Sequence, residues 1–206
     1  MAQPSSVTRS KILRAALKRF AHCGYVGTSV QDIVDAAKVT KPALYYYFKS
    51  KAGLYQALLD WAYDERLRVM QEASLRNGVL ADQLTNILTD LFEFMVSHRE
   101  LMRIGFATAF AALGEIPAAV NYLKKAQRNF EYLHDLVKKG LAAGALNKKF
   151  TSRELTMGIF GMLTIYVMAY LVEPKKKLGR KAGESIVQLY LSGAAGGHFN
   201  PKSAGA

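Results

Sequence analysis

A lysine and three consecutive tyrosines lie close together in the segment KPALYYYF, residues 41–48. A lysine ammonium binds phosphate oxygens, and a tyrosine offers a hydroxyl for hydrogen bonding and a ring for apolar contact with thymine methyl groups. On one short helix, these side chains suit contact with the backbone and the base edges of DNA. The residues that we predict to face the major groove are Lys41, Ala43, Tyr45 and Tyr46.

Two short helices joined by a tight turn are predicted to hold these side chains in place. Thr28 and Gln31 fit a capping box at the start of the first helix, and Thr40 is expected to cap the second. Leu44 and Phe48 are four residues apart, so both should point into a core. Such a helix-turn-helix presents its second helix to the major groove. The buried face of the first helix is predicted to consist of Val30, Ile33, Val34 and Ala37.

An amphipathic helix is predicted upstream, from Thr8 to Cys23, with Gly24 ending it. Residues 1–51 hold 9 Lys/Arg and 2 Asp/Glu, a net charge of +7, whereas the other 155 residues hold 19 and 14, a net charge of +5. Positive charge concentrated beside a helix-turn-helix indicates a polyanion as partner. The basic residues on the polar face of this helix are Arg9, Lys11, Arg14, Lys18 and Arg19.

The spacing of Tyr45, Phe48 and Lys51 is the most specific part of a longer pattern. The other residues of this pattern are Phe20, Gly24, Thr28, Ile33, Ala37, Val39, Thr40, Leu44 and Leu54. On these residues, segment 8–54 resembles the DNA-binding domain of the TetR family of bacterial transcriptional regulators. The resemblance covers about a quarter of the chain.

The resemblance implies specific roles for residues of this segment. The residues that would hold DNA phosphates are Thr28, Thr40, Tyr45 and Lys51, and positions 40–46 would supply most base contacts. Lys38 departs from the family pattern, because the family usually has glycine in this turn. A left-handed backbone there costs a non-glycine residue on the order of 1 kcal/mol. We therefore expect either a strained Lys38 or an altered turn.

The whole chain is predicted to be all-α, with an N-terminal three-helix helix-turn-helix domain at residues 1–52. A larger helical domain for ligand binding and dimerisation should occupy residues 53–206, since 206 residues can bury a sizeable core. The helices of this second part are predicted at residues 54–76, 80–96, 102–113 and 117–144, then from 152 or 153 onward. The polar start and the tail from Gly193 to Ala206 are expected to be mobile.

No spacing of residues predicts an enzyme or a metal site. The four histidines are far apart, and the chain has no HExxH, no GxSxG and no glycine-rich phosphate loop. We therefore predict no catalytic residue, no metal and no cofactor. Cys23 is the single cysteine and suits a reducing cytoplasm. We expect it to be a small core residue rather than a redox-sensing thiol.

The segment from Leu155 to Val172 contains 18 residues without a charge and has two interpretations. It meets the minimum for a transmembrane helix, which would make the chain a membrane-anchored helical interaction protein. Its glycines, threonines and tyrosines favour instead a buried helix that packs on its own core and on a second subunit. The resemblance implies that helices near 153–172 and 182–192 form a four-helix dimer interface. We predict a cytoplasmic homodimer that reads palindromic double-stranded DNA, with no membrane contact and no signal peptide.

Large aromatic and methionine residues recur in the middle helices. They fit either a plain core or the wall of a cavity for a small molecule. The resemblance implies such a cavity, whose ligand changes the separation of the two recognition helices and so releases a repressor from its operator. The residues predicted to line it are Phe92, Met102, Arg103, Phe106, Tyr122, Phe130, His134, Phe160 and Tyr166.

Overall fold

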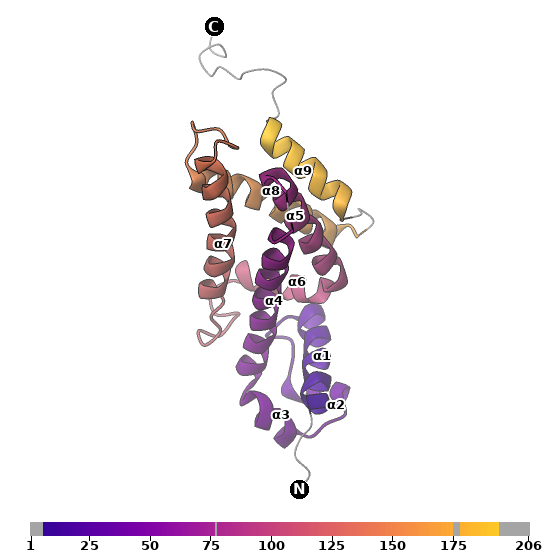
Figure 1. The fold of residues 1–206 in the computed structure, drawn as a ribbon. Helices are drawn as coiled ribbons and strands as arrows, with labels where there is room; N and C mark the ends of the chain where they lie inside the picture. Colours follow the sequence, from indigo (N-terminus) through magenta and orange to yellow (C-terminus); the bar gives the residue numbers. More distant parts are fainter. Residues whose placement is uncertain (1–5, 77, 175–177, 194–206) are drawn as a thin grey trace. The chain divides into compact units, whose positions relative to one another are not determined.

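A computed structural model describes residues 6–76, 78–174 and 178–193 (Figure 1). These residues form nine α-helices and no strand, which confirms the predicted all-α class. The helices are α1 (Ser6–Cys23), α2 (Val30–Ala37), α3 (Lys41–Phe48), α4 (Lys51–Ser74), α5 (Leu80–Ser97), α6 (Arg99–Ala109), α7 (Leu123–Ala142), α8 (Ser152–Val172) and α9 (Arg180–Ser192). Most of the expected mobile start and tail lies outside the described residues.

The chain divides into two compact units. Unit 1 comprises Met1–Arg68 and Met95–Phe130, and unit 2 comprises Val69–Phe94 and Glu131–Ala206. The helix-turn-helix falls wholly within unit 1. The predicted functional boundary after residue 52 lies inside α4, which continues through it, and it stays a prediction.

In unit 1, α1 packs against α2, α3 and α6. Ile12, Ala16 and Phe20 form its buried face, and the predicted amphipathic helix is confirmed, since its basic residues are exposed. The Phe20 ring meets the Tyr55 ring edge-on at 4.9 Å, which fixes α1 against α4. The expected burial of Cys23 is wrong, because this residue is exposed on the last turn of α1.

The predicted helix start at Pro117 is also wrong, because α7 begins only at Leu123. The Asn121 backbone N–H donates to Oε1 of Gln56 at 2.7 Å, and Gln56 Nε2 donates to the Asn121 carbonyl at 3.1 Å. Asn121 Oδ1 then accepts the Leu123 N–H at 3.2 Å. Contacts with α4 therefore hold the chain out of helical conformation before α7, and the short sequence pattern could not reveal them.

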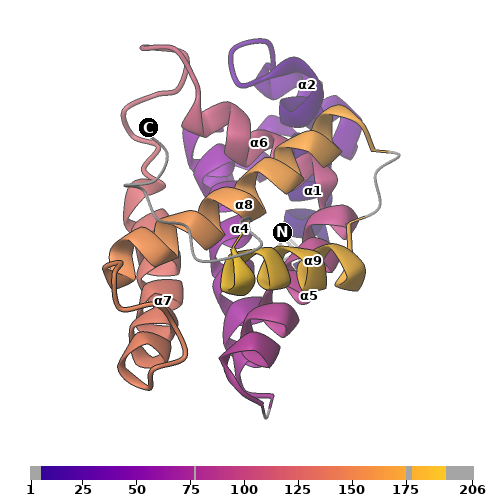
Figure 2. The ribbon, with the colours of Figure 1, turned by 90° about the horizontal axis from the view of Figure 1, so that it is seen from above.

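In unit 2, α8 and α9 pack together, coloured orange and yellow in Figures 1 and 2. A capping box begins α8, since Thr151 Oγ1 accepts the Glu154 N–H and Glu154 accepts the Thr151 N–H. Gly183 of α9 lies close to α5, where an added Cβ would stand 3.1 Å from Thr89 Oγ1. A small residue is therefore needed at this helix crossing.

Helix α8 is long and apolar enough to cross a membrane by length and composition, with a mean hydropathy of 1.9. Only 28% of its most apolar stretch is buried within the chain. One face is buried and comprises Thr156, Ile159, Leu163, Val167 and Tyr170. The other face is uncovered and includes Met157, Ile165, Tyr166, Met168 and Val172. The helix thus packs on its own core along one side only.

Candidate nucleic-acid interface

The first helix of the helix-turn-helix begins one residue later than predicted. Ser29, not Thr28, caps α2, and its box partner is Asp32 rather than Gln31. The Ser29 N–H donates to Asp32 Oδ2 at 2.8 Å, and the Asp32 N–H donates to Ser29 Oγ at 3.1 Å. Hydrogen bonds from Ser29 are the main reason that the pKa of Asp32 lies below its usual value.

Thr28 has an internal role in the loop before α2. Its side chain is 1% exposed, and its hydroxyl donates to the Gly24 carbonyl at 2.8 Å. The predicted phosphate contact by Thr28 would need this hydroxyl to leave its partner. Ser29 is exposed at the same helix start, and the Ser-x-x-Asp spacing was the signal that could have identified it.

Helix α3 presents the side chains that the sequence placed on its outer face. Thr40 caps it, because its Oγ1 accepts the Ala43 N–H at 3.4 Å. Leu44 is 0% and Phe48 6% exposed, so these two residues fix the inner face. The outer face is formed by Lys41, Tyr45 and Tyr46, with Tyr45 45% and Tyr46 67% exposed, while Ala43 is half-buried. Leu44 and Phe48 are buried as predicted, and Lys41, Tyr45 and Tyr46 are exposed; their contacts with DNA stay a prediction.

The turn between α2 and α3 contains Lys38 in a left-handed conformation, with φ 53° and ψ 50°. Its backbone N–H caps α2 by donating to the Asp35 and Val34 carbonyls. Of the two expected alternatives, the chain therefore has the strained lysine in an ordinary turn. This conformation costs a non-glycine residue about 1–2 kcal/mol.

Lys51, predicted to hold a phosphate, already has partners within unit 1. Its Nζ donates to the Tyr25 carbonyl at 3.0 Å and to the Thr28 carbonyl at 2.9 Å. The ammonium also lies 4.2 Å from the centre of the Tyr25 ring. Lys51 thus ties the loop before α2 to the first turn of α4, and one of its three N–H groups remains for another acceptor.

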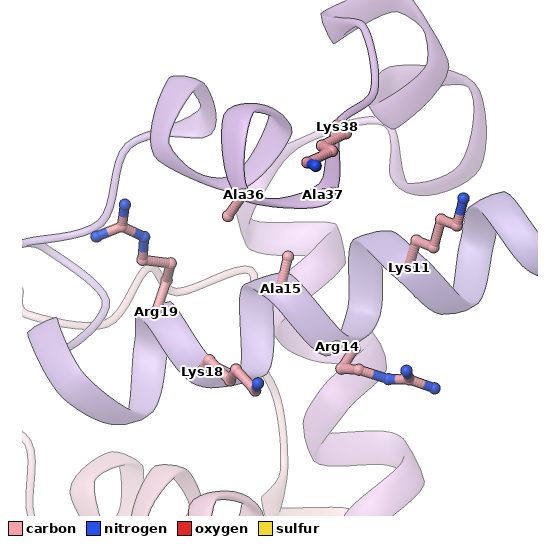
Figure 3. A pocket seen from close by; sticks show the side chains of 8 residues that line it. All are labelled: Lys11, Arg14, Ala15, Lys18, Arg19, Ala36, Ala37 and Lys38. Atoms are coloured by element: carbon pink, nitrogen blue, oxygen red, sulfur yellow. The ribbon is translucent and has the colours of Figure 1, made fainter.

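The basic face predicted for α1 forms one wall of a hollow of about 410 Å³ in unit 1, here named the basic groove (Figure 3). Its floor consists of small side chains of α1 and α2, and its rim consists of cations. The lining residues are Lys11, Arg14, Ala15, Lys18, Arg19, Ala36, Ala37 and Lys38. The sequence predicted the charges of α1, whereas the hollow depends on how α2 docks against them.

The nine residues predicted to line a ligand cavity are divided between the units. In unit 1, Tyr122 stacks on Tyr63 with ring centres 6.0 Å apart, and Arg103 is exposed. In unit 2, His134 Nε2 lies 2.9 Å from Ser152 Oγ and its Nδ1 lies 3.2 Å from Glu131 Oε2, so both ring nitrogens have a partner. The other predicted residues are Met102, Phe106 and Phe130 in unit 1, and Phe92, Phe160 and Tyr166 in unit 2, where Phe92 stacks on Tyr166 with ring centres 6.4 Å apart.

Arg66 of α4 is a polar group that the sequence analysis missed. Its Nε is buried and has no hydrogen-bond partner among the described residues. Its guanidinium carbon lies 5.8 Å from the centre of the Tyr63 ring, and burial lowers the pKa of Arg66. In the sequence, Arg66 looks like any charged helix residue, and only the fold shows that it is desolvated.

The chain has relatives of known class. Residues 12–58 match the family described as bacterial regulatory proteins, tetR family. The probable HTH-type transcriptional regulator YttP of Bacillus subtilis is 31% identical over 98 residues, which cover 47% of this chain and 47% of YttP. The HTH-type transcriptional repressor KstR2 of Mycolicibacterium smegmatis is 26% identical over 201 residues, covering 95% and 92%. FadR from Bacillus subtilis in complex with stearoyl-CoA shares the fold, with a TM-score of 0.77 at 19% identity over 91% of this chain and 100% of that chain.

An exposed, basic and tyrosine-bearing second helix in a helix-turn-helix defines a DNA-binding protein. Residues 12–58 carry the DNA-binding domain of the TetR family of bacterial regulatory proteins, and the chain is similar to proteins named as HTH-type transcriptional regulators. It covers between 31% and 53% of the length of three Bacillus subtilis regulators that it matches. The similarity to those three regulators therefore concerns only part of their length.

Proposed function

We propose that the protein is a cytoplasmic homodimer that represses transcription from a palindromic operator and is released by a small molecule. The observation that carries this proposal is the outer face of α3, where Lys41, Tyr45 and Tyr46 stand exposed over a buried Leu44 and Phe48. Thr40, Tyr45 and Lys51 are proposed to hold phosphates, and Ser29 joins them in place of the buried Thr28 hydroxyl.

The uncovered side of α8, continued by α9, supports the homodimer. Ile165 is 57% and Val172 87% exposed, and Leu189 of α9 is 46% exposed. Large apolar side chains left exposed on two packed helices are typical of an interaction surface. In a symmetric dimer the same helices of two subunits cover each other, and two recognition helices about one DNA turn apart then match a palindrome.

The same apolar surface is compatible with a second candidate function, that of a membrane-anchored helical interaction protein that uses residues 155–172. The two candidates differ in fractionation. The regulator stays in the soluble fraction without detergent and sediments as a dimer, whereas an anchored protein enters solution only with detergent. A soluble monomer would contradict both.

Arg66 supports a small-molecule effector and suggests its chemistry. The buried Arg66 Nε has no hydrogen-bond partner among the described residues, which costs about 1–3 kcal/mol, and an acidic group would supply a partner. We therefore propose an effector with a carboxylate or phosphate. Repression rather than activation is supported by the similarity to KstR2, a transcriptional repressor. A fold that can hold a ligand is supported by the similarity to FadR in complex with stearoyl-CoA.

The test is the selection of bound fragments from random and genomic DNA at physiological salt. The double variant Lys41→Ala/Tyr45→Ala is the control. Enrichment of a palindrome by the wild type alone supports the proposal, and no enrichment contradicts it. Acidic compounds are then screened for release of the selected operator. An effector that acts equally on wild type and on Arg66→Met would contradict the proposed role of Arg66.

A further inference from the structure

The proposed contacts between α3 and DNA bases do not account for the basic groove. Its lining residues come from α1, from the end of α2 and from the turn that follows, and none belongs to α3. Its five cations, Lys11, Arg14, Lys18, Arg19 and Lys38, are all exposed, and no acidic residue lines the hollow (Figure 3). The groove is therefore a second positive surface on unit 1, distinct from the outer face of α3.

The charge of the basic groove is not neutralised within the part of the chain that the structure describes. None of its five cations takes part in an ion pair there, and Arg19 acts on Asp32 only as the smallest of several influences on its pKa. Elsewhere in unit 1, Lys125 and Arg128 lie 2.6 and 2.8 Å from Asp64 oxygens. Lys125 and Arg128 thus have acidic partners within unit 1, whereas the five cations of the groove have none among the described residues.

The spacing of the cations increases their mutual repulsion. Lys11, Arg14 and Lys18 follow one another at three and four residues on α1, so like charges are neighbours on one face of the helix. A bound anion would relieve this repulsion. The alanines of the floor, Ala15 and Ala36, leave the hollow open to a group of phosphate size.

The position of the groove in the chain identifies its partner. Lys38 precedes Thr40, the cap of α3, by two residues, so the rim of the groove continues into the proposed DNA surface. A polyanion already bound at α3 is the nearest source of phosphates. We propose that the basic groove binds backbone phosphates of the DNA that flanks each operator half-site. This inference rests on the proposed function and extends the DNA contact beyond the palindrome.

The test compares two duplexes, the selected palindrome alone and the same palindrome extended by about ten base pairs of unrelated sequence on each side. The wild type should bind the extended duplex more tightly, with a log–log salt slope steeper by about 0.9 for each added phosphate contact. With one contact per subunit, the advantage of the extended duplex should fall about twelvefold between 50 and 200 mM salt.

The variant Arg14→Gln/Lys18→Gln should lose this advantage and keep its affinity for the short duplex, which also shows that it folds. The matched control is Lys148→Gln/Lys149→Gln, which removes the same charge from exposed lysines of unit 2 and should keep the advantage. A wild type that binds the palindrome with no preference for length would overturn the inference and leave the proposed function intact.

Two further outcomes would also overturn it. If the control variant loses the advantage of the extended duplex as well, the effect comes from net charge alone. If Arg14→Gln/Lys18→Gln loses affinity equally for both duplexes, the groove contacts the operator itself and not its flanks. Failure to bind any palindrome would contradict the proposed function, and the inference with it.

Discussion

Replacing Lys51 by methionine separates two roles that this side chain could have. The change keeps the apolar stem and removes the ammonium, and with it both hydrogen bonds to the Tyr25 and Thr28 carbonyls. Hydrogen bonds from charged groups contribute about 1.5–3 kcal/mol each, and partial exposure reduces this. With about 0.5 kcal/mol from the Tyr25 ring, Lys51→Met should lower the free energy of unfolding by about 2–3 kcal/mol.

The assay is denaturant unfolding followed by fluorescence of Trp61, the single tryptophan, which lies in unit 1. Lys124→Met is the control, because Lys124 is exposed in the same unit and should change stability by less than about 0.5 kcal/mol. A loss in Lys51→Met no larger than in the control would refute the tie between the loop and α4.

The same pair of variants tests the phosphate role of Lys51. If its remaining N–H group binds a phosphate, Lys51→Met reduces the log–log salt slope of DNA binding by about 0.9 per subunit, and affinity falls about equally for all sequences. A lower stability with an unchanged slope would show that Lys51 positions the helix-turn-helix and does not touch DNA.

Three other predictions follow from backbone and burial. Gly53→Ala would place a Cβ 2.3 Å from the Phe48 carbonyl oxygen, so it should destabilise the fold by about 1–3 kcal/mol and weaken operator binding. Gly105→Ala, where the added Cβ meets open space, should instead stabilise the fold by about 0.5–1 kcal/mol. Thermal unfolding distinguishes the two variants, and equal effects would contradict the close approach at Gly53. Lys38→Gly removes about 1–2 kcal/mol of backbone strain, but it also raises the entropy of the unfolded chain, which costs about 0.4–1 kcal/mol. The free energy of unfolding should therefore rise by about 0.5 kcal/mol in denaturant unfolding. A clear decrease would contradict a strained turn. Burial raises the pKa of Tyr190 to about 12, so its contribution to stability is complete below pH 10 and is lost as pH rises toward 12. In Tyr190→Phe that part of the alkaline loss should disappear, as measured by unfolding at pH 9–12, and an identical pH profile would contradict the shift.

Local sequence patterns predicted the helices well but could not choose between neighbouring registers. Thr28 with Gln31 and Ser29 with Asp32 both fit a capping box, and the choice depends on the Thr28 hydroxyl bonding to Gly24 instead. The buried residues Ile33, Val34 and Ala37 of α2, and Leu44 and Phe48 of α3, were predictable from apolar spacing, whereas the predicted Val30 is only half-buried.

Features that depend on distant residues could not be read from the sequence. Lys51 reaches carbonyls 23 and 26 residues away, and Asn121 is held by Gln56 from 65 residues away. The desolvation of Arg66 and the hollow of the basic groove likewise arise only when helices dock. The candidate recognition residues were predictable from local pattern, whereas the residues that position them were not.

The central claim is that the outer face of α3 reads base sequence. It is tested most directly by measuring the affinity of Tyr46→Ala for the selected operator and for random DNA at one salt concentration. Tyr46 is 67% exposed on α3 and has no role in the core, so folding should be unaffected. The claim predicts that the ratio of specific to random affinity falls about 5- to 150-fold, which is 1–3 kcal/mol per lost base contact. An equal loss for both DNAs, with an unchanged ratio, would contradict it.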